Sequence, residues 1–308
     1  MNNIKDIKVR IGYACINLAL DKKYRTFRLR TIQDNDINKI KEVIHHNIIL
    51  YSDIIHYNIK NNIYVYRLTS DVIPFASHTD MQRILDKYEI LQSPKIINEL
   101  DRIKKLQAKY NLRLSMHPSQ FTVLTSTKRE VIKNSIEEIK WQTNFMKQVG
   151  GENIIIHIGG AYGDKSSALK RFEKTLEEYN NEIDLSFLTI ENDDKTYTSQ
   201  EVVELCRILG LKWVYDFHHE RCNPSKGIDI IELLRSYPPD KYHLSSGING
   251  VYKPPHADYI DREDYKALLE QVSKAHIKEI DVMFEAKQKN LAITNIVQPI
   301  GGGYWVLK

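Results

Sequence analysis

The fold is decided by residues 186–219, which read SFLTIENDDKTYTSQEVVELCRILGLKWVYDFHH. Ser186–Glu191 and Leu211–Phe217 are short, β-rich apolar runs, and each predicts a strand. Thr198-Ser199-Gln200-Glu201 is a capping box, which predicts the start of a helix. Behind it the apolar residues recur with helical period, at Val202, Val203, Leu205, Cys206 and Leu209. The stretch therefore predicts a strand, a helix and a second strand.

The same alternation extends along the whole chain. The predicted strands are Lys8–Cys15, Ile63–Leu68, Leu112–His117, Asn153–Ile158, Ser186–Glu191, Leu211–Phe217, Lys241–Ser245 and Ile280–Glu285. Helical periodicity separates them, and Thr127-Lys128-Arg129-Glu130 predicts a second capping box. Eight such units predict a single (β/α)8 TIM barrel as one domain over residues 1–308. An open, doubly wound sheet is the alternative, but no glycine-rich phosphate fingerprint follows the first strand.

Composition excludes several classes of protein. Of the 308 residues, 42% are hydrophobic and 27% are charged, as in an ordinary globular protein with a large core. The net charge of +4 neither requires nor excludes nucleic acid. Cys15, Cys206 and Cys222 form no CxxC pair, which argues against a disulfide framework or a zinc ribbon. No apolar run approaches the ~18 residues of a membrane span, so we expect a cytoplasmic protein.

Ionisable side chains stand at the ends of six consecutive predicted strands. They are His117, His157, Glu191, Asp216 with His219, His243 and Glu285. The carboxyl ends of barrel strands meet at one mouth, where the active site of such a barrel lies. One such residue alone is usually a cap or a packed core histidine. Six at the same register would repel one another or lose hydration unless something compensates them.

Divalent cations would compensate this cluster, because imidazole and carboxylate together suit zinc, manganese or iron. Glu191 lies in the middle of the series and is placed to bridge two ions. His256 and Asp258 add another pair after the seventh strand, enough for two or three metals. His78 follows the second strand on the mouth side, and we include it among the candidate ligands. The other histidines, at 45, 46, 56 and 276, fall in helical stretches and are expected to be surface or packing residues.

Ten segments of the chain resemble one known family in both order and spacing. They are RIGYACIN (10–17), YRTFR (24–28), SH (77–78), SMHPSQFT (115–122), HIGG (157–160), ENDDK (191–195), DFHH (216–219), KYHLSS (241–246), HAD (256–258) and MFEAK (283–287). They resemble the UV damage endonucleases, which share a barrel superfamily with metal-dependent apurinic endonucleases and xylose isomerase-like enzymes. Each segment is weakly specific by itself, whereas the whole series is highly specific.

The resemblance implies a nick in double-stranded DNA immediately 5′ to a UV photoproduct, made by metal-activated water and leaving a 3′-hydroxyl. Cyclobutane pyrimidine dimers and 6-4 photoproducts are the implied substrates, with abasic sites as a further one. Manganese is the usual ion of the family, with Zn²⁺, Co²⁺ and Mg²⁺ as alternatives. The metal ligands that the resemblance implies are His117, His157, Glu191, Asp216, His219, His243, His256 and Glu285. Glu191, Lys241, His243 and Tyr13 are expected to be catalytic. Lys241 falls where the family implies a carboxylated lysine, and a plain lysine that reaches a DNA phosphate stays the alternative.

Gln120 and Phe121 match the pair that the family inserts into DNA at the lesion. A dimer stacks poorly, so it costs less to unstack than an intact step, and an aromatic ring can take the vacated place. A buried loop anchor is the alternative for Phe121. Tyr13 and Asn17 are expected to line the lesion pocket. Arg25, Arg28, Arg30 and Lys195 are expected to contact phosphates, although such a run is more often a solvated face.

Two other functions use the same barrel. A metal-dependent sugar isomerase or epimerase would need a small closed pocket, whereas the Gln-aromatic loop and the arginines fit DNA better. A damage-recognition module without catalysis would not need a water-activating cluster. Access of DNA to the mouth also favours a monomer.

Overall fold

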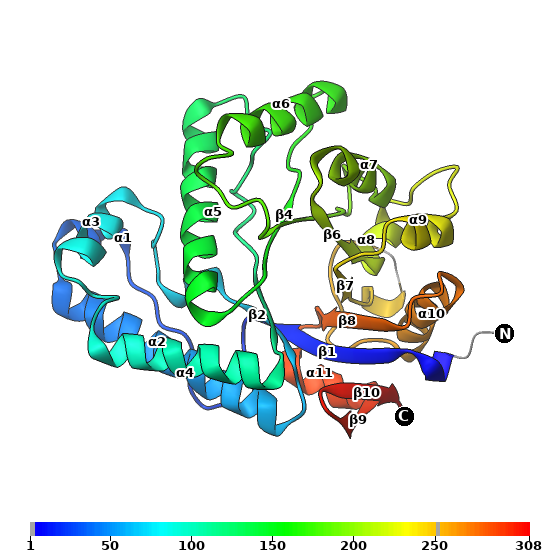
Figure 1. Ribbon diagram of the computed structural model, residues 1–308, viewed down its shortest axis with the longest axis horizontal. Helices are drawn as coiled ribbons and strands as arrows, with labels where there is room; N and C mark the ends of the chain where they lie inside the picture. The colour runs from blue at the N-terminus through cyan, green and yellow to red at the C-terminus, as the bar shows by residue number, and fades with distance from the viewer. Residues whose placement is uncertain (1–3, 251–252) are drawn as a thin grey trace.

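Eight parallel strands close into a barrel in the computed structural model, which describes residues 4–250 and 253–308 (Figure 1). The strands are β1 (Lys8–Ala14), β2 (Val65–Leu68), β3 (Arg113–Met116), β4 (Asn153–His157), β5 (Leu188–Glu191), β6 (Lys212–Asp216), β7 (Lys241–Leu244) and β8 (Glu279–Phe284). Each lies within two residues of its predicted bounds. Because β1 pairs in parallel with both β8 and β2, the sheet closes, and the open-sheet alternative is wrong.

Helices connect the strands and cover the outside of the barrel (Figure 1). They are α1 (Leu29–Gln33), α2 (Ile37–Lys60), α3 (Thr79–Lys87), α4 (Pro94–Tyr110), α5 (Arg129–Val149), α6 (Lys165–Glu178), α7 (Ser199–Leu209), α8 (Phe217–Cys222), α9 (Ile230–Ser236), α10 (Arg262–Lys274) and α11 (Lys289–Ile296). Short 3-10 turns are η1 (Ile4–Asp6), η2 (Ser70–Val72) and η3 (Ile248–Gly250). Across the described ranges, we find no helix with the length and apolar character needed to cross a bilayer.

One predicted capping box is confirmed and the other is wrong. Thr198 and Glu201 form the predicted capping box at the start of α7. Helix α5 instead begins at Arg129, with Lys128 at the N-cap and no side-chain cap. The reason is local. The amide of Lys128 donates to the hydroxyl of Ser126, so Ser126, and not Thr127, is the residue whose side chain stabilises the turn before α5.

A C-terminal hairpin, β9 (Val297–Gly301) and β10 (Tyr304–Leu307), was not among the predicted elements. Strand β10 pairs antiparallel with the first half of β1, beside the barrel (Figure 1). Trp305 anchors the hairpin because its buried indole donates to the carbonyl oxygen of Asn62 at 2.9 Å. The hairpin thus extends the sheet to ten strands without opening the barrel.

Side chains alternate along β1 between the helices and the barrel interior. Tyr13 contributes to the main core between the barrel and its helices, whereas Ala14 packs in a small inner cluster with Val65 and Met283. Gly12 faces the neighbouring strand so closely that an added Cβ would lie 1.8 Å from the carbonyl oxygen of Val65. Glycine is therefore required where β1 and β2 close the barrel.

Candidate active site

The predicted ligands gather at the carboxyl ends of the strands. Glu191 ends β5, His157 ends β4 and Asp216 ends β6. His117 directly follows β3, and Glu285 directly follows β8. Parallel strands of similar length thus deliver residues distant in sequence to one place, as the strand-end pattern predicts.

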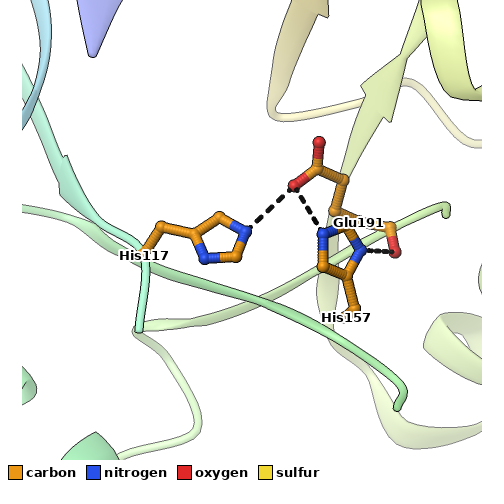
Figure 2. A group of neighbouring side chains, drawn as sticks. All are labelled: His117, His157 and Glu191. Atoms are coloured by element: carbon orange, nitrogen blue, oxygen red, sulfur yellow. Dashed lines mark hydrogen bonds and ion pairs between the residues drawn. The ribbon is translucent and has the colours of Figure 1, made fainter. Parts of the chain in front are cut away.

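Glu191 is the centre of this cluster, and its side chain is almost fully buried. His117 Nε2 lies 3.3 Å from Glu191 Oε2, and His157 Nε2 lies 3.7 Å from the same oxygen. Figure 2 shows both imidazoles turned toward the carboxylate. Ligand atoms of the three residues all lie within 4.8 Å of one another, so one cation could contact all of them.

The other carboxylate oxygen of Glu191 faces a second group. His243 Nδ1 lies 2.8 Å from Glu191 Oε1, and the two residues form with Asp216 another set whose ligand atoms lie within 4.8 Å. All three side chains are buried. Glu191 is the one residue common to both groups, which is the arrangement a carboxylate bridging two cations requires.

The remaining predicted ligands surround these groups. His219 Nδ1 lies 3.7 Å from Asp216 Oδ2 and 3.8 Å from Glu191 Oε1. Glu285 Oε1 lies 3.3 Å from His243 Nδ1. His256 is held by the backbone oxygen of Glu285, 2.8 Å from its Nδ1, and its ring centre lies 6.4 Å from that of His219. The structure therefore brings together eight of the ten predicted ligands.

Two observations show that the cluster fits divalent cations. Within residues 4–250 and 253–308, Asp216 Oδ2 and His243 Nε2 are buried and have no hydrogen-bond partner, which is costly unless another group satisfies them. His117 Nδ1 lies 2.8 Å from the carbonyl oxygen of Pro118, an outer contact that fixes the ring and leaves Nε2 free toward Glu191. Nitrogen and carboxylate donors of this kind suit manganese, zinc or iron.

The electrostatics of the cluster are those of concentrated negative charge. Burial opposes ionisation of Glu191, but His243 and His157 outweigh it and hold the pKa of Glu191 well below its usual range. Burial raises the pKa of Asp216. Burial would lower the pKa of His219, but Asp216, Glu191 and Glu285 together raise it to about 9. Without cations, therefore, the raised pKa of His219 keeps positive charge beside these carboxylates.

Comparison with known proteins settles the family. The sequence model of the UV-endonuclease UvdE family matches residues 9–302. The chain belongs to this family. It is 36% identical over 257 residues to the UV DNA damage endonuclease of Bacillus velezensis, covering 80% of this chain and 78% of the relative. It is 31% identical over 311 residues to the protein of the same name from Bacillus cereus, covering 95% and 94%.

Solved structures agree with this UvdE membership. The crystal structure of SacUVDE superposes with a TM-score of 0.77 at 26% identity, covering 92% of this chain and 95% of that one. Endonuclease IV from Thermus thermophilus gives 0.56 at 13% identity, covering 92% and 94%. The 3-keto-D-glucoside 4-epimerase YcjR from E. coli gives 0.54 at 10% identity, covering 91% and 92%. The last two likenesses show the shared barrel alone.

Two candidate ligands lie outside the cluster. His78 is exposed and forms the N-cap of α3, where its Nδ1 accepts from the amide of Asp80 at 3.3 Å. Asp258 is exposed in the segment after β7, and its backbone oxygen accepts from the amide of Gln288. Among residues 4–250 and 253–308, neither side chain joins the groups around Glu191.

The structure corrects the expected position of Tyr13 and Asn17. Tyr13 is fully buried, and its hydroxyl donates to Asn58 of α2 at 2.8 Å. Asn17 is also buried and donates to the Tyr13 hydroxyl at 2.7 Å. The alternation along β1 turns Tyr13 toward the helices, so neither side chain lines an open pocket in this structure.

Lys241 lies deeper in the barrel than the ligands. It starts β7, two residues before His243, and its fully buried Nζ lies 3.4 Å from Asn153 Oδ1 at the start of β4. Burial, aided by the nearby Arg113, lowers the pKa of Lys241 to about 8. Because the ammonium is buried, the alternative of a plain lysine on a DNA phosphate does not agree with this position.

The predicted DNA-contacting residues on loops are exposed. Phe121 is 77% exposed in the loop after β3, which rules out the buried loop anchor, and Gln120 beside it is exposed as well. Arg25 pairs with Glu42 at 2.9 Å, and Lys195 lies 3.9 Å from Asp194. Arg28 is an exposed N-cap of α1, and Arg30 is exposed beside Asp34.

Arg67 is a site residue that sequence reasoning missed. It lies in β2 and forms an ion pair with Glu285, and both side chains are largely buried. Burial opposes ionisation of Glu285, but Arg67 and His243 lower its pKa to about 2. A charged residue inside an otherwise apolar strand was the available signal, because such a residue needs a buried partner.

We expect Arg67→Met to destabilise the protein by about 3 kcal/mol, because removing one member of a buried ion pair leaves the other charge uncompensated. Urea denaturation of the chelator-treated protein measures this loss. Arg30→Met is the matched control, because Arg30 is 83% exposed and its pair with Asp34 should contribute less than about 1 kcal/mol. Equal stability losses for the two variants would contradict the role of the Arg67–Glu285 pair.

Proposed function

We propose that this UvdE-family chain incises double-stranded DNA immediately 5′ to UV photoproducts and leaves a 3′-hydroxyl. Cyclobutane pyrimidine dimers, 6-4 photoproducts and abasic sites are the proposed lesions. Two or three divalent cations, Mn²⁺ first among them, are the proposed cofactors. The observation that carries the proposal is the buried Glu191, whose two oxygens face separate groups of metal-ligating side chains.

Each side chain has a proposed task. His117, His157 and Glu191 would hold one cation, and Glu191, Asp216 and His243 another, with His219, His256 and Glu285 completing the shell. Bound cations would supply a nucleophile at neutral pH and neutralise charge at the scissile phosphate. Arg67 balances Glu285 and keeps that carboxylate in place. His78 and Asp258 stay candidates as outlying ligands.

The loops would recognise the lesion. Gln120 and Phe121 would enter the duplex where stacking is already weak. Arg25, Arg28 and Lys195 would contact the DNA backbone.

The proposal also includes three buried residues. Tyr13 and Asn17 would line the lesion pocket, and they would need to move to reach the lesion. Carboxylation of Lys241 is also proposed, since the lowered pKa favours the neutral amine that reacts with carbon dioxide. A single domain, a monomeric state and a cytoplasmic location remain predictions.

Nicking of supercoiled plasmid tests the proposal. UV-irradiated plasmid is expected to be relaxed in the presence of Mn²⁺, whereas unirradiated plasmid is not. An oligonucleotide duplex with one defined dimer then maps the cut on a denaturing gel, where a product ending directly 5′ to the dimer is expected. Equal inactivity on irradiated and unirradiated plasmid with every metal would overturn the proposal.

Phe121→Ala is expected to weaken binding to dimer-containing DNA by about 5- to 100-fold, the range for loss of one base–aromatic stack. Its thermal stability should not change, because the side chain is 77% exposed. Fluorescence anisotropy with a labelled duplex measures the affinity. Ile208→Ala is the control, since Ile208 is 72% exposed on α7. Wild-type affinity in Phe121→Ala would show that the ring does not contact the lesion.

A further inference from the structure

The loop between β4 and α6 carries an aromatic side chain that has no role in the proposed incision of DNA. Tyr162 lies in this loop, five residues after the candidate ligand His157, and is 53% exposed. The carboxyl-end loops of a barrel surround its active site, so Tyr162 stands on the mouth side.

The backbone at Tyr162 is unfavourable for tyrosine. The amide of Asp164 donates to the carbonyl oxygen of Ala161, which closes a turn with Tyr162 and Gly163 at its centre. Their φ angles are +52° and +86°. Turns with two positive φ angles favour asparagine or glycine at the first central position, and a bulky residue there is strained. Such strain is typical of functional sites, so the exposed ring is a candidate for a functional contact.

Arg171 links this ring to the loop that carries Phe121. Its guanidinium carbon lies 5.5 Å from the centre of the Tyr162 ring, and its Nε donates to the carbonyl oxygen of Thr125 at 2.8 Å. The two loops also touch directly, since a Cβ added at Gly159 would lie 2.8 Å from Thr125 Oγ1. One arginine of α6 thus supports both aromatic-bearing loops.

We infer that Tyr162 is a second aromatic contact to DNA, stacking on a base or sugar beside the lesion, and that Arg171 positions both loops. The inference rests on the proposed function, because it assumes that DNA occupies this mouth. Arg171 occupies one side of the ring, and the large exposed fraction leaves the ring accessible to a ligand. A ring backed by a cation is well suited to stacking on nucleic acid.

Substitutions at Tyr162 separate a role in binding from a role in folding. Tyr162→Asn suits the turn, so its melting temperature should equal or exceed that of the wild type. Its Kd for a dimer-containing duplex, measured by anisotropy without metal, should rise about 5- to 100-fold. Tyr162→Phe keeps the ring and should bind within about 3-fold of the wild type. Tyr88→Ala is the control, because Tyr88 is also exposed and has Lys87 Nζ 5.4 Å from its ring centre.

Arg171→Met tests the positioning role. It should weaken binding, and its effect should be less than additive with that of Tyr162→Asn, because both substitutions disturb one unit. Full additivity would overturn the positioning role of Arg171.

The outcomes distinguish the inference from the proposed function. Wild-type affinity in Tyr162→Asn, a lowered melting temperature in that variant, or equal weakness in Tyr162→Phe would overturn the stacking contact. If wild-type protein nicks irradiated plasmid and Tyr162→Asn binds and nicks equally well, the inference fails and the proposed function stands. If wild-type protein binds dimer-containing DNA but never nicks it, the proposed function fails, and the affinity of Tyr162→Asn still decides the inference.

Discussion

Glu191→Gln is expected to abolish incision of UV-irradiated DNA while leaving the barrel folded. Glutamine has the same shape but lacks the charge, and Glu191 is the residue shared by both candidate metal groups. Mutations of groups that merely support a ligand already cost ~10- to 100-fold in metal affinity or activity. Loss of a bridging carboxylate should therefore exceed about 100-fold. Initial rates of plasmid nicking with Mn²⁺ measure the effect.

A surface variant makes the Glu191 result interpretable. Glu177→Gln removes one carboxylate from an exposed position on α6 and should nick at the wild-type rate. Circular dichroism should give the same spectrum for both variants. Incision by Glu191→Gln within a few-fold of the wild type would show that the bridging role is wrong.

Removal of divalent cations is expected to abolish incision and to lower the melting temperature. The cluster buries Glu191, Asp216 and His243 together, and bound cations would stabilise the folded state by mass action. One site at about 100 times its Kd contributes about 2.7 kcal/mol. Protein treated with a chelator and dialysed should be inactive, and added Mn²⁺ should restore both nicking and melting temperature.

The matched variant separates specific from general metal effects. Glu191→Gln should show a smaller rise in melting temperature with Mn²⁺ than the wild type, because it lacks the shared ligand. Full incision by protein shown by elemental analysis to be metal-free would contradict the dependence. An equal Mn²⁺-induced shift in both proteins would place the stabilising cation elsewhere.

The arrangement of the eight strands and of the ligand cluster followed from sequence because both depend on local periodicity. A short apolar run ends where polar residues begin, and in a parallel barrel every such end falls at the same mouth. His117, Glu191 and Glu285 could therefore be placed together although Glu285 lies 168 positions after His117 in the sequence.

Other features required the tertiary structure. The buried position of Tyr13 depends on which face of β1 meets α2, and the sequence of a strand buried on both faces does not distinguish them. The partner of Arg67 could not be found because Glu285 lies on the other side of β1 in the sheet order. The turn that strains Tyr162 and the Arg171 contact that joins two loops likewise arise from packing. The sequence by itself determined which residues reach the mouth, since strand ends are set locally. Only the folded chain decided which side chains face one another, because those contacts join segments distant in sequence.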